Sequence, residues 1–123
     1  MARTARRLSG DEAENLALKE LKRAGLKAVT RNFHCRHGEI DLIMLDGNCL
    51  VFVEVRYRGR GSLVDAVATV DARKQRKLAQ TAAVYLSRHS EFQHHPCRFD
   101  VVGISERDDG DCVFRWLNDA FRT

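Results

Sequence analysis

The 123-residue sequence contains a single proline, few aromatic side chains (7%) and no long apolar run. The scarcity of proline, together with the lack of low-complexity tracts and internal repeats, argues against an extended linker between domains. No segment approaches the roughly 18 consecutive apolar residues that a membrane-spanning helix needs. The basic N-terminus has no apolar stretch behind it, so it does not read as a secretory signal. We therefore expect one globular domain in the cytoplasm.

Close cysteine pairs are also lacking, because none of the four cysteines forms a C-x-x-C motif. Without an export signal, this pattern predicts reduced thiols rather than disulfides. A second metal-binding interpretation remains open, in which His34-Cys35-x-His37 and His94-His95-x-Cys97 meet and bind zinc. These spacings match no zinc finger or ribbon, and surface histidines beside a strand and a turn are the simpler interpretation.

Charged residues are abundant, at 31% of the sequence with a net charge of +4, which permits a polyanionic partner.

Capping and turn residues divide the chain into seven predicted helices and strands. A capping box from Ser9 to Glu12 predicts a helix start, and Gly25 its end. The predicted elements are a helix (10–24), strands (27–34, 39–46 and 49–57), a helix (71–89) and strands (98–105 and 112–116). The order α-β-β-β-α-β-β predicts an α/β fold with a mixed β-sheet flanked by helices.

The predicted hairpin carries four charges within runs that otherwise read as buried strand: Glu39, Asp41, Glu54 and Arg56. Charges inside such runs are costly unless they are paired or bind something. If Gly47 and Asn48 are the central turn residues, Asp41 lies opposite Glu54 and Glu39 lies opposite Arg56. If the turn is centred one residue earlier, Asp41 becomes a diagonal neighbour of Glu54. Alternation of side chains keeps all four charges on one face in either register.

The other face of the hairpin is apolar, so the sheet is expected to be covered on both sides. The residues of that face are Ile40, Leu42, Met44, Val51, Val53, Val55 and Tyr57. Two carboxylates held side by side repel each other unless a cation neutralises them. Mg²⁺ suits such a pair, since it usually takes one or two carboxylates together with waters and phosphate oxygens. The alternative is a structural ladder of salt bridges, with Glu39 paired to Arg56 and Asp41 beside them.

Each predicted helix adds one polar candidate on its inward side. Glu14 falls within the apolar arc of the first helix, although an acid in a first turn is also favoured by the helix dipole. Gln75 points into the apolar stripe of the second helix, with Lys74 at the edge of that stripe. A lone inward glutamine is more often a satisfied core group than part of a site.

These residues resemble two nested families. Asp41, twelve residues and then Glu54-Val55-Arg56 resemble the D…(D/E)-x-K signature of the PD-(D/E)XK, or restriction-endonuclease-like, nuclease superfamily. The wider pattern GDEAE…L…G…RNF…GEIDLI…VFVEVRYR…KQRKL…YL…RFDVV, from Gly10 to Val102, resembles the YraN-like family of uncharacterised bacterial proteins. The resemblance implies a restriction-endonuclease-like fold, with residues 10–123 as one nuclease-like domain after a basic, flexible arm at residues 1–9.

The superfamily resemblance also implies roles for the candidate residues. Asp41 and Glu54 would bind Mg²⁺ (or Mn²⁺), with the Val55 carbonyl as a third ligand, and a metal-bound water would attack a phosphodiester bond. Glu14 would be an outer or second-metal acid, and Gln75 would lie near the site. Arg56 departs from the signature, which has lysine at that position. Arginine stays protonated, so Arg56 could hold a phosphate but could not act as a general base.

Basic side chains flank the candidate site. The expected nucleic-acid contacts are Arg58, Arg60, Arg73, Lys74 and Lys77. The sequence therefore favours a Mg²⁺-dependent DNA endonuclease, with resemblance to archaeal Holliday-junction resolvases pointing to branched or recombination-related DNA. Such resolvases commonly act as dimers, which allows a homodimer. Two other functions remain open: a non-catalytic nucleic-acid-binding module, and a protein-interaction domain with a structural acidic cluster.

Overall fold

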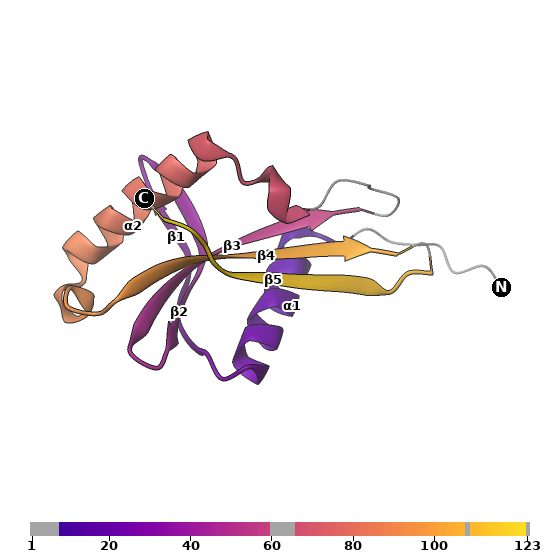
Figure 1. Cartoon of the computed structure of the whole chain (residues 1–123), viewed down its shortest axis with the longest axis horizontal. Coiled ribbons are helices and arrows are strands. Elements are labelled where there is room, and N and C mark those ends of the chain that lie inside the picture. Colours follow the sequence, from indigo (N-terminus) through magenta and orange to yellow (C-terminus); the bar gives the residue numbers. More distant parts are fainter. Residues whose placement is uncertain (1–7, 60–65, 108, 123) are drawn as a thin grey trace.

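The computed structural model describes residues 8–59, 66–107 and 109–122. Two helices and five strands follow the predicted order (Figure 1). Their bounds are α1 (Gly10–Arg23), β1 (Lys27–Cys35), β2 (Gly38–Asp46), β3 (Cys49–Arg58), α2 (Ala72–Arg88), β4 (Cys97–Glu106) and β5 (Cys112–Phe121), with short 3-10 helices at Ala66–Thr69 and Ser90–Phe92. The predicted α/β class and element order are confirmed.

The local signals that predicted the helix starts are present. Ser9 and Glu12 form the capping box of α1, and the Asp71 side chain accepts a hydrogen bond from the Lys74 N–H at the start of α2. Gly25 ends α1 with φ at 104°, a conformation that favours glycine. Leu8 is held against β3, because its N–H donates to the Tyr57 hydroxyl (3.1 Å). The rest of the predicted arm, residues 1–7, lies outside the described residues.

The sheet has the strand order β1-β2-β3-β4-β5. All neighbouring strands are antiparallel except β3 and β4, which are parallel. Antiparallel neighbours need only short turns, whereas the parallel pair needs a crossover, and α2 supplies it. The sheet is therefore mixed, as the sequence predicted.

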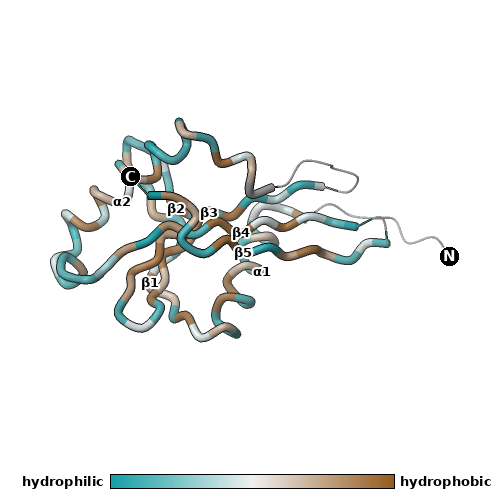
Figure 2. Tube along the Cα trace, in the orientation of Figure 1, coloured by the Kyte–Doolittle hydropathy of each residue, from teal (hydrophilic) through white to brown (hydrophobic). Residues whose placement is uncertain are grey.

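The two helices cover opposite faces of the sheet (Figure 1). On the α1 side, Ala13, Ala17 and Leu21 pack on the central strands; on the α2 side, Leu78, Ala82 and Tyr85 do so. Figure 2 shows the hydrophobic segments gathered in the middle strands and the hydrophilic ones at loops and strand ends. The sheet is thus buried on both faces, which explains the nearly continuous apolar runs of β2 and β3.

Two details differ from the sequence prediction. Ile40 packs with the α2-side cluster, whereas Leu42 and Met44 pack with the α1-side cluster. Simple alternation therefore fails at the start of β2, where the β2–β3 ladder has ended and β2 pairs only with β1. β5 also continues to Phe121, five residues beyond the predicted end.

The extension of β5 depends on a bulge. Asp119 has φ at 52°, and the register shifts between the pairs Val101–Leu117 and Phe99–Phe121. The Asp119 N–H donates to the buried Asp100 carboxylate (2.9 Å), which satisfies the group that the bulge removes from the ladder. Asn118-Asp119 is a turn-like dipeptide, so nothing local predicts that the strand resumes after it.

Candidate active site

The β2–β3 hairpin adopts the first of the two predicted registers. Asp46 pairs with Cys49 and Leu42 with Val53, so Gly47 and Asn48 are the two turn residues. The regular ladder stops at Leu42 and Val53, one residue before Asp41 and Glu54 would pair. The candidate site therefore lies where the two strands separate.

Where the strands separate, the Asp41 side chain replaces the β2 backbone as the hydrogen-bond partner of β3. Its Oδ2 accepts a hydrogen bond from the Val55 N–H at 2.8 Å. Since the N–H and C=O of one strand residue point to the same side, the Val55 carbonyl also faces Asp41. The structure thus brings together Asp41, Glu54 and the Val55 backbone, which the family resemblance suggested as sources of metal ligands.

Asp41 and Glu54 are both buried, with exposed fractions of 8% and 4%. Burial, a shared hydrogen bond with Glu54 and the Glu54 charge together raise the pKa of Asp41 from 3.8 to about 8. The Val55 N–H and the Lys74 charge oppose this rise. Without a cation nearby, Asp41 therefore takes up a proton more readily than an ordinary aspartate.

Two basic side chains lie against Glu54. Lys74 Nζ is 3.1 Å and an Arg56 guanidinium nitrogen is 3.6 Å from Glu54 Oε2. Neither contact has hydrogen-bond geometry, so Glu54 Oε2 is a buried oxygen without a hydrogen bond among the described residues. Within the same part of the chain, Arg56 Nε is likewise a buried donor without an acceptor. Such unsatisfied atoms are costly, and their clustering here is typical of a site that binds a ligand.

Glu14 from α1 joins the edge of this group. Its carboxylate contacts Arg31 (3.6 Å), and the Asn32 amide, in its donating orientation, lies 3.1 Å from Glu14 Oε1. Burial and the neighbouring Asp41 charge raise the pKa of Glu14. Glu14 is therefore close enough to influence Asp41 while being held by β1, which suits an outer position.

Two other residues lie elsewhere than the sequence suggested. The Glu39 carboxylate lies 3.1 Å from His34 Nδ1, its cross-strand neighbour on β1, so the proposed Glu39–Arg56 ladder is not how these charges pair. The Gln75 amide donates to the Val70 carbonyl (3.2 Å), at the approach to α2. Gln75 thus fixes the start of this helix, and its contact in the described chain is with the backbone rather than with the carboxylates.

A basic pocket of about 310 Å³ opens beside the carboxylates. We call it the cation pocket; it is lined by Arg56, Thr69, Asp71, Arg73, Lys74 and Lys77. Four of the six lining side chains are cationic, and two of them, Arg56 and Lys74, also contact Glu54, so the pocket adjoins the acidic pair. Arg58 is exposed at the end of β3, and Arg60 lies outside the described residues.

The donor set fits a hard cation better than zinc. Among the described residues, no three His, Cys, Asp or Glu side chains are grouped to hold a metal. His34 lies at the β1–β2 turn, whereas His95 contacts the Asn48 carbonyl (2.6 Å) at the other end of β2, so the predicted zinc ligands do not meet. Two buried carboxylates, one of them with an oxygen that has no hydrogen bond among the described residues, suit Mg²⁺ or Mn²⁺, which retain several waters.

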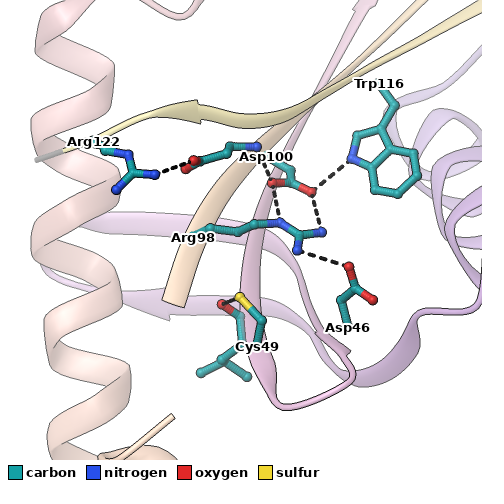
Figure 3. Close-up of polar contacts among 8 residues, drawn as sticks. Asp46, Cys49, Arg98, Asp100, Trp116 and Arg122 are labelled. Carbon is teal, nitrogen blue, oxygen red and sulfur yellow. Dashed lines mark hydrogen bonds and ion pairs between the residues drawn. The ribbon is translucent and has the colours of Figure 1, made fainter. Parts of the chain in front are cut away.

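A buried polar network that the sequence did not reveal surrounds Asp100 of β4, which pairs with Val53 of β3 (Figure 3). The fully buried Asp100 carboxylate accepts two hydrogen bonds from Arg98 (3.0 and 3.3 Å), one from Trp116 (2.9 Å) and one from Asp119. Arg98 also contacts Asp46 (2.9 Å) at the end of β2. These acidic neighbours raise the pKa of Arg98. The network ties β2, β4 and β5 together and has a structural role.

Comparisons with known proteins bear on the whole chain. A family model described as "Uncharacterised protein family UPF0102" matches residues 13–104. A UPF0102 protein of Alcanivorax borkumensis is 49% identical over 113 residues, which cover 92% of this chain and 90% of that protein. A UPF0102 protein of Nitrosococcus oceani is 50% identical with the same coverage, and one of Pseudomonas syringae is 43% identical over 98% of both chains. In addition, none of the described helices is long and apolar enough to cross a membrane.

Proposed function

Because the chain belongs to the uncharacterised protein family UPF0102, whose name states no activity, we propose its function from its own site. The protein is a Mg²⁺-dependent endonuclease of the restriction-endonuclease-like type that hydrolyses phosphodiester bonds in DNA. Branched or recombination-related DNA is the preferred substrate class, on the resemblance to resolvases. The YraN-like resemblance agrees with the family; the nuclease superfamily is part of this proposal.

One observation carries the proposal: a buried pair of carboxylates lies beside a pocket lined by four cations, two of which contact Glu54. The acidic pair is suited to a divalent cation, and the cation pocket is suited to phosphate groups. Arg56 and Lys74 belong to both, since each lines the pocket and contacts Glu54. An ion-pair cluster with only a structural role would not need buried polar atoms that lack hydrogen bonds beside a basic pocket.

The residues of the acidic pair and of the cation pocket have different roles in this proposal. Asp41, Glu54 and the Val55 carbonyl would hold the metal, which when bound lowers the pKa of a coordinated water and stabilises charge on a phosphate. The Val55 N–H orients the Asp41 carboxylate toward Glu54. Arg56 donates to phosphate oxygens from the border of the pocket, and it does not remove a proton, because a guanidinium stays protonated.

The proposal predicts divalent-metal-dependent cleavage. The purified protein should cut linear, single-stranded or four-way-junction DNA with Mg²⁺ or Mn²⁺ and not with EDTA, as measured by strand scission on gels. Glu54→Gln keeps the shape of the side chain but loses a ligand charge, so it should lower the rate by at least ~100-fold. Lys27→Met, a change at the far end of β1, is the matched control. No cleavage of any of these substrates with either metal would end the enzyme proposal.

A second function is favoured by one specific feature, the arginine at position 56. A site that keeps its phosphate contacts but lacks the signature lysine fits a non-catalytic nucleic-acid-binding module. Binding by the parent protein and by Asp41→Ala, with cleavage by neither, would establish this alternative. Binding by both with cleavage by the parent alone would exclude it.

Both functions predict binding to DNA that weakens with salt. Lys77→Ala removes one phosphate contact from the cation pocket, so it should weaken binding about equally for unrelated sequences. The slope of log K against log[salt] should fall by roughly one unit, measured by fluorescence anisotropy at several salt concentrations. An unchanged slope would mean that the cation pocket does not contact the nucleic acid.

A further inference from the structure

Glu54 is contacted by two cations from different elements. The strand position that carries lysine in the signature holds Arg56, which comes within 3.6 Å of Glu54 Oε2. Lys74 comes from the first turn of α2 and lies closer, at 3.1 Å. The two side chains are about equally exposed, at 31% and 29%, so both are reachable from the cation pocket. An ammonium group is therefore present at the acidic pair although the strand lacks one.

The position of Lys74 is fixed by the start of its helix. Asp71 caps α2 by accepting from the Lys74 N–H itself at 2.9 Å. The next residue, Gln75, ties the helix to the Val70 carbonyl at 3.2 Å. With its backbone held on both sides, Lys74 has to order only its side chain to reach Glu54. This contact differs in that respect from an ion pair between two mobile surface chains.

The two cations are suited to different tasks. A guanidinium is planar and binds two oxygens of one phosphate in a fork, whereas an ammonium is a compact donor that can turn toward several oxygens in succession. Arg56 lines the cation pocket, and its buried Nε donor has no acceptor among the described residues. Both features are expected of a side chain that binds phosphate. Lys74 lies against the carboxylate oxygen that has no hydrogen bond among the described residues.

We propose, building on the proposed endonuclease function, that Lys74 supplies from α2 the catalytic ammonium that the β3 position lacks. Its Nζ donates hydrogen bonds to the attacking water and to an oxygen of the scissile phosphate, while Arg56 holds the phosphate from the other side. In this hydrolysis the water oxygen bonds to phosphorus and the bond to one ester oxygen breaks. The proton of the water passes to solvent, and the leaving oxygen takes up another.

A cycle of two substitutions tests the proposal by DNA cleavage. Lys74→Met should lower kcat by about 100-fold or more, the effect of losing one well-placed donor. Arg56→Lys should raise KM, because the guanidinium fork is lost, and should lower kcat much less than Lys74→Met does, because Lys74 is still present. The double variant Arg56→Lys/Lys74→Met should recover at least about tenfold over Lys74→Met, since an ammonium returns on β3. Lys77→Met, one turn along the same helix, should raise KM instead of lowering kcat.

A second readout uses Mn²⁺ alone, without nucleic acid. Removing the positive charge beside Glu54 should tighten Mn²⁺ binding by about threefold or more in Lys74→Met, measured by electron paramagnetic resonance. Lys77→Met should have a smaller effect. A variant that merely loses structure would bind Mn²⁺ more weakly, so tighter binding together with lost kcat supports the proposal.

The outcomes distinguish a wrong role for Lys74 from a wrong endonuclease function. If the parent cleaves DNA and Lys74→Met has the same kcat, the role of Lys74 is refuted while the endonuclease function stands. If Lys74→Met loses both kcat and Mn²⁺ binding, or if the double variant recovers nothing, Lys74 has a structural role and the proposal is wrong. If the parent cleaves no substrate, the endonuclease function and the role of Lys74 fall together.

Discussion

Asp100→Asn is expected to lower the free energy of unfolding by about 3–5 kcal/mol, as measured by urea denaturation. The Asp100 carboxylate is fully buried and accepts from Arg98, Trp116 and the Asp119 N–H. Asparagine offers one oxygen in place of two and turns an N–H₂ group toward these donors. It also leaves the Arg98 guanidinium, only 15% exposed, without its main counter-charge. A buried charge that loses its partner is among the most destabilising changes that a single substitution makes.

Asp46→Asn is the matched control, because it breaks the other ion pair of Arg98. The Asp46 side chain is 44% exposed, so its loss should cost less than about 1 kcal/mol. Equal effects of the two substitutions would show that burial of the Asp100 carboxylate does not govern the stability of the network. A cost below about 1 kcal/mol for Asp100→Asn would contradict the structural role of the network altogether.

The parts of the fold that could be predicted are those set by residues near one another in the chain. The capping box at Ser9, the turn at Gly47-Asn48 and the cap at Asp71 each fixed an element boundary within a residue or two. The hairpin register follows from the turn, and it puts Asp41 and Glu54 near each other just beyond the last ladder pair, Leu42–Val53. Local hydrogen bonding and side-chain alternation are sufficient for this much of the site.

The parts that could not be predicted depend on contacts between distant residues. β5 resumes after Asp119 only because Asp100, on the neighbouring strand, satisfies the bulge. Lys74 meets Glu54 because of how α2 lies over the sheet, and helical periodicity does not specify that placement. Glu39 pairs with His34 on β1, a strand that the hairpin geometry left out of account. The errors at β5 and at Glu39 came from treating one strand or one hairpin as if it had no neighbours.

Asp41→Asn is expected to make the metal-free protein more stable at pH 8 while removing the proposed cleavage. Folded Asp41 has a pKa of about 8, against 3.8 for an ordinary aspartate, because of burial and the Glu54 carboxylate. Between these two values the folded state binds more protons than the unfolded state, so the free energy of unfolding falls as the pH rises. For one titrating group, the free energy of unfolding falls by up to about 1.4 kcal/mol per pH unit. Asparagine stays neutral, so the variant does not lose stability as the pH rises. At pH 8 its free energy of unfolding should exceed that of the parent by at least about 2 kcal/mol.

Thermal or urea unfolding between pH 5 and pH 9 measures this difference. The parent should lose stability across that range, and Asp41→Asn should be nearly flat; Asp111→Asn, an exposed change that leaves Asp41 intact, should retain the slope of the parent. Mg²⁺ should restore stability to the parent at pH 8 by binding the folded state, and should do so much less for Asp41→Asn. A parent whose stability is independent of pH in this range would contradict the raised pKa of Asp41. A substitution that stabilises the protein and removes its metal response would indicate that Asp41 is retained for binding rather than for folding.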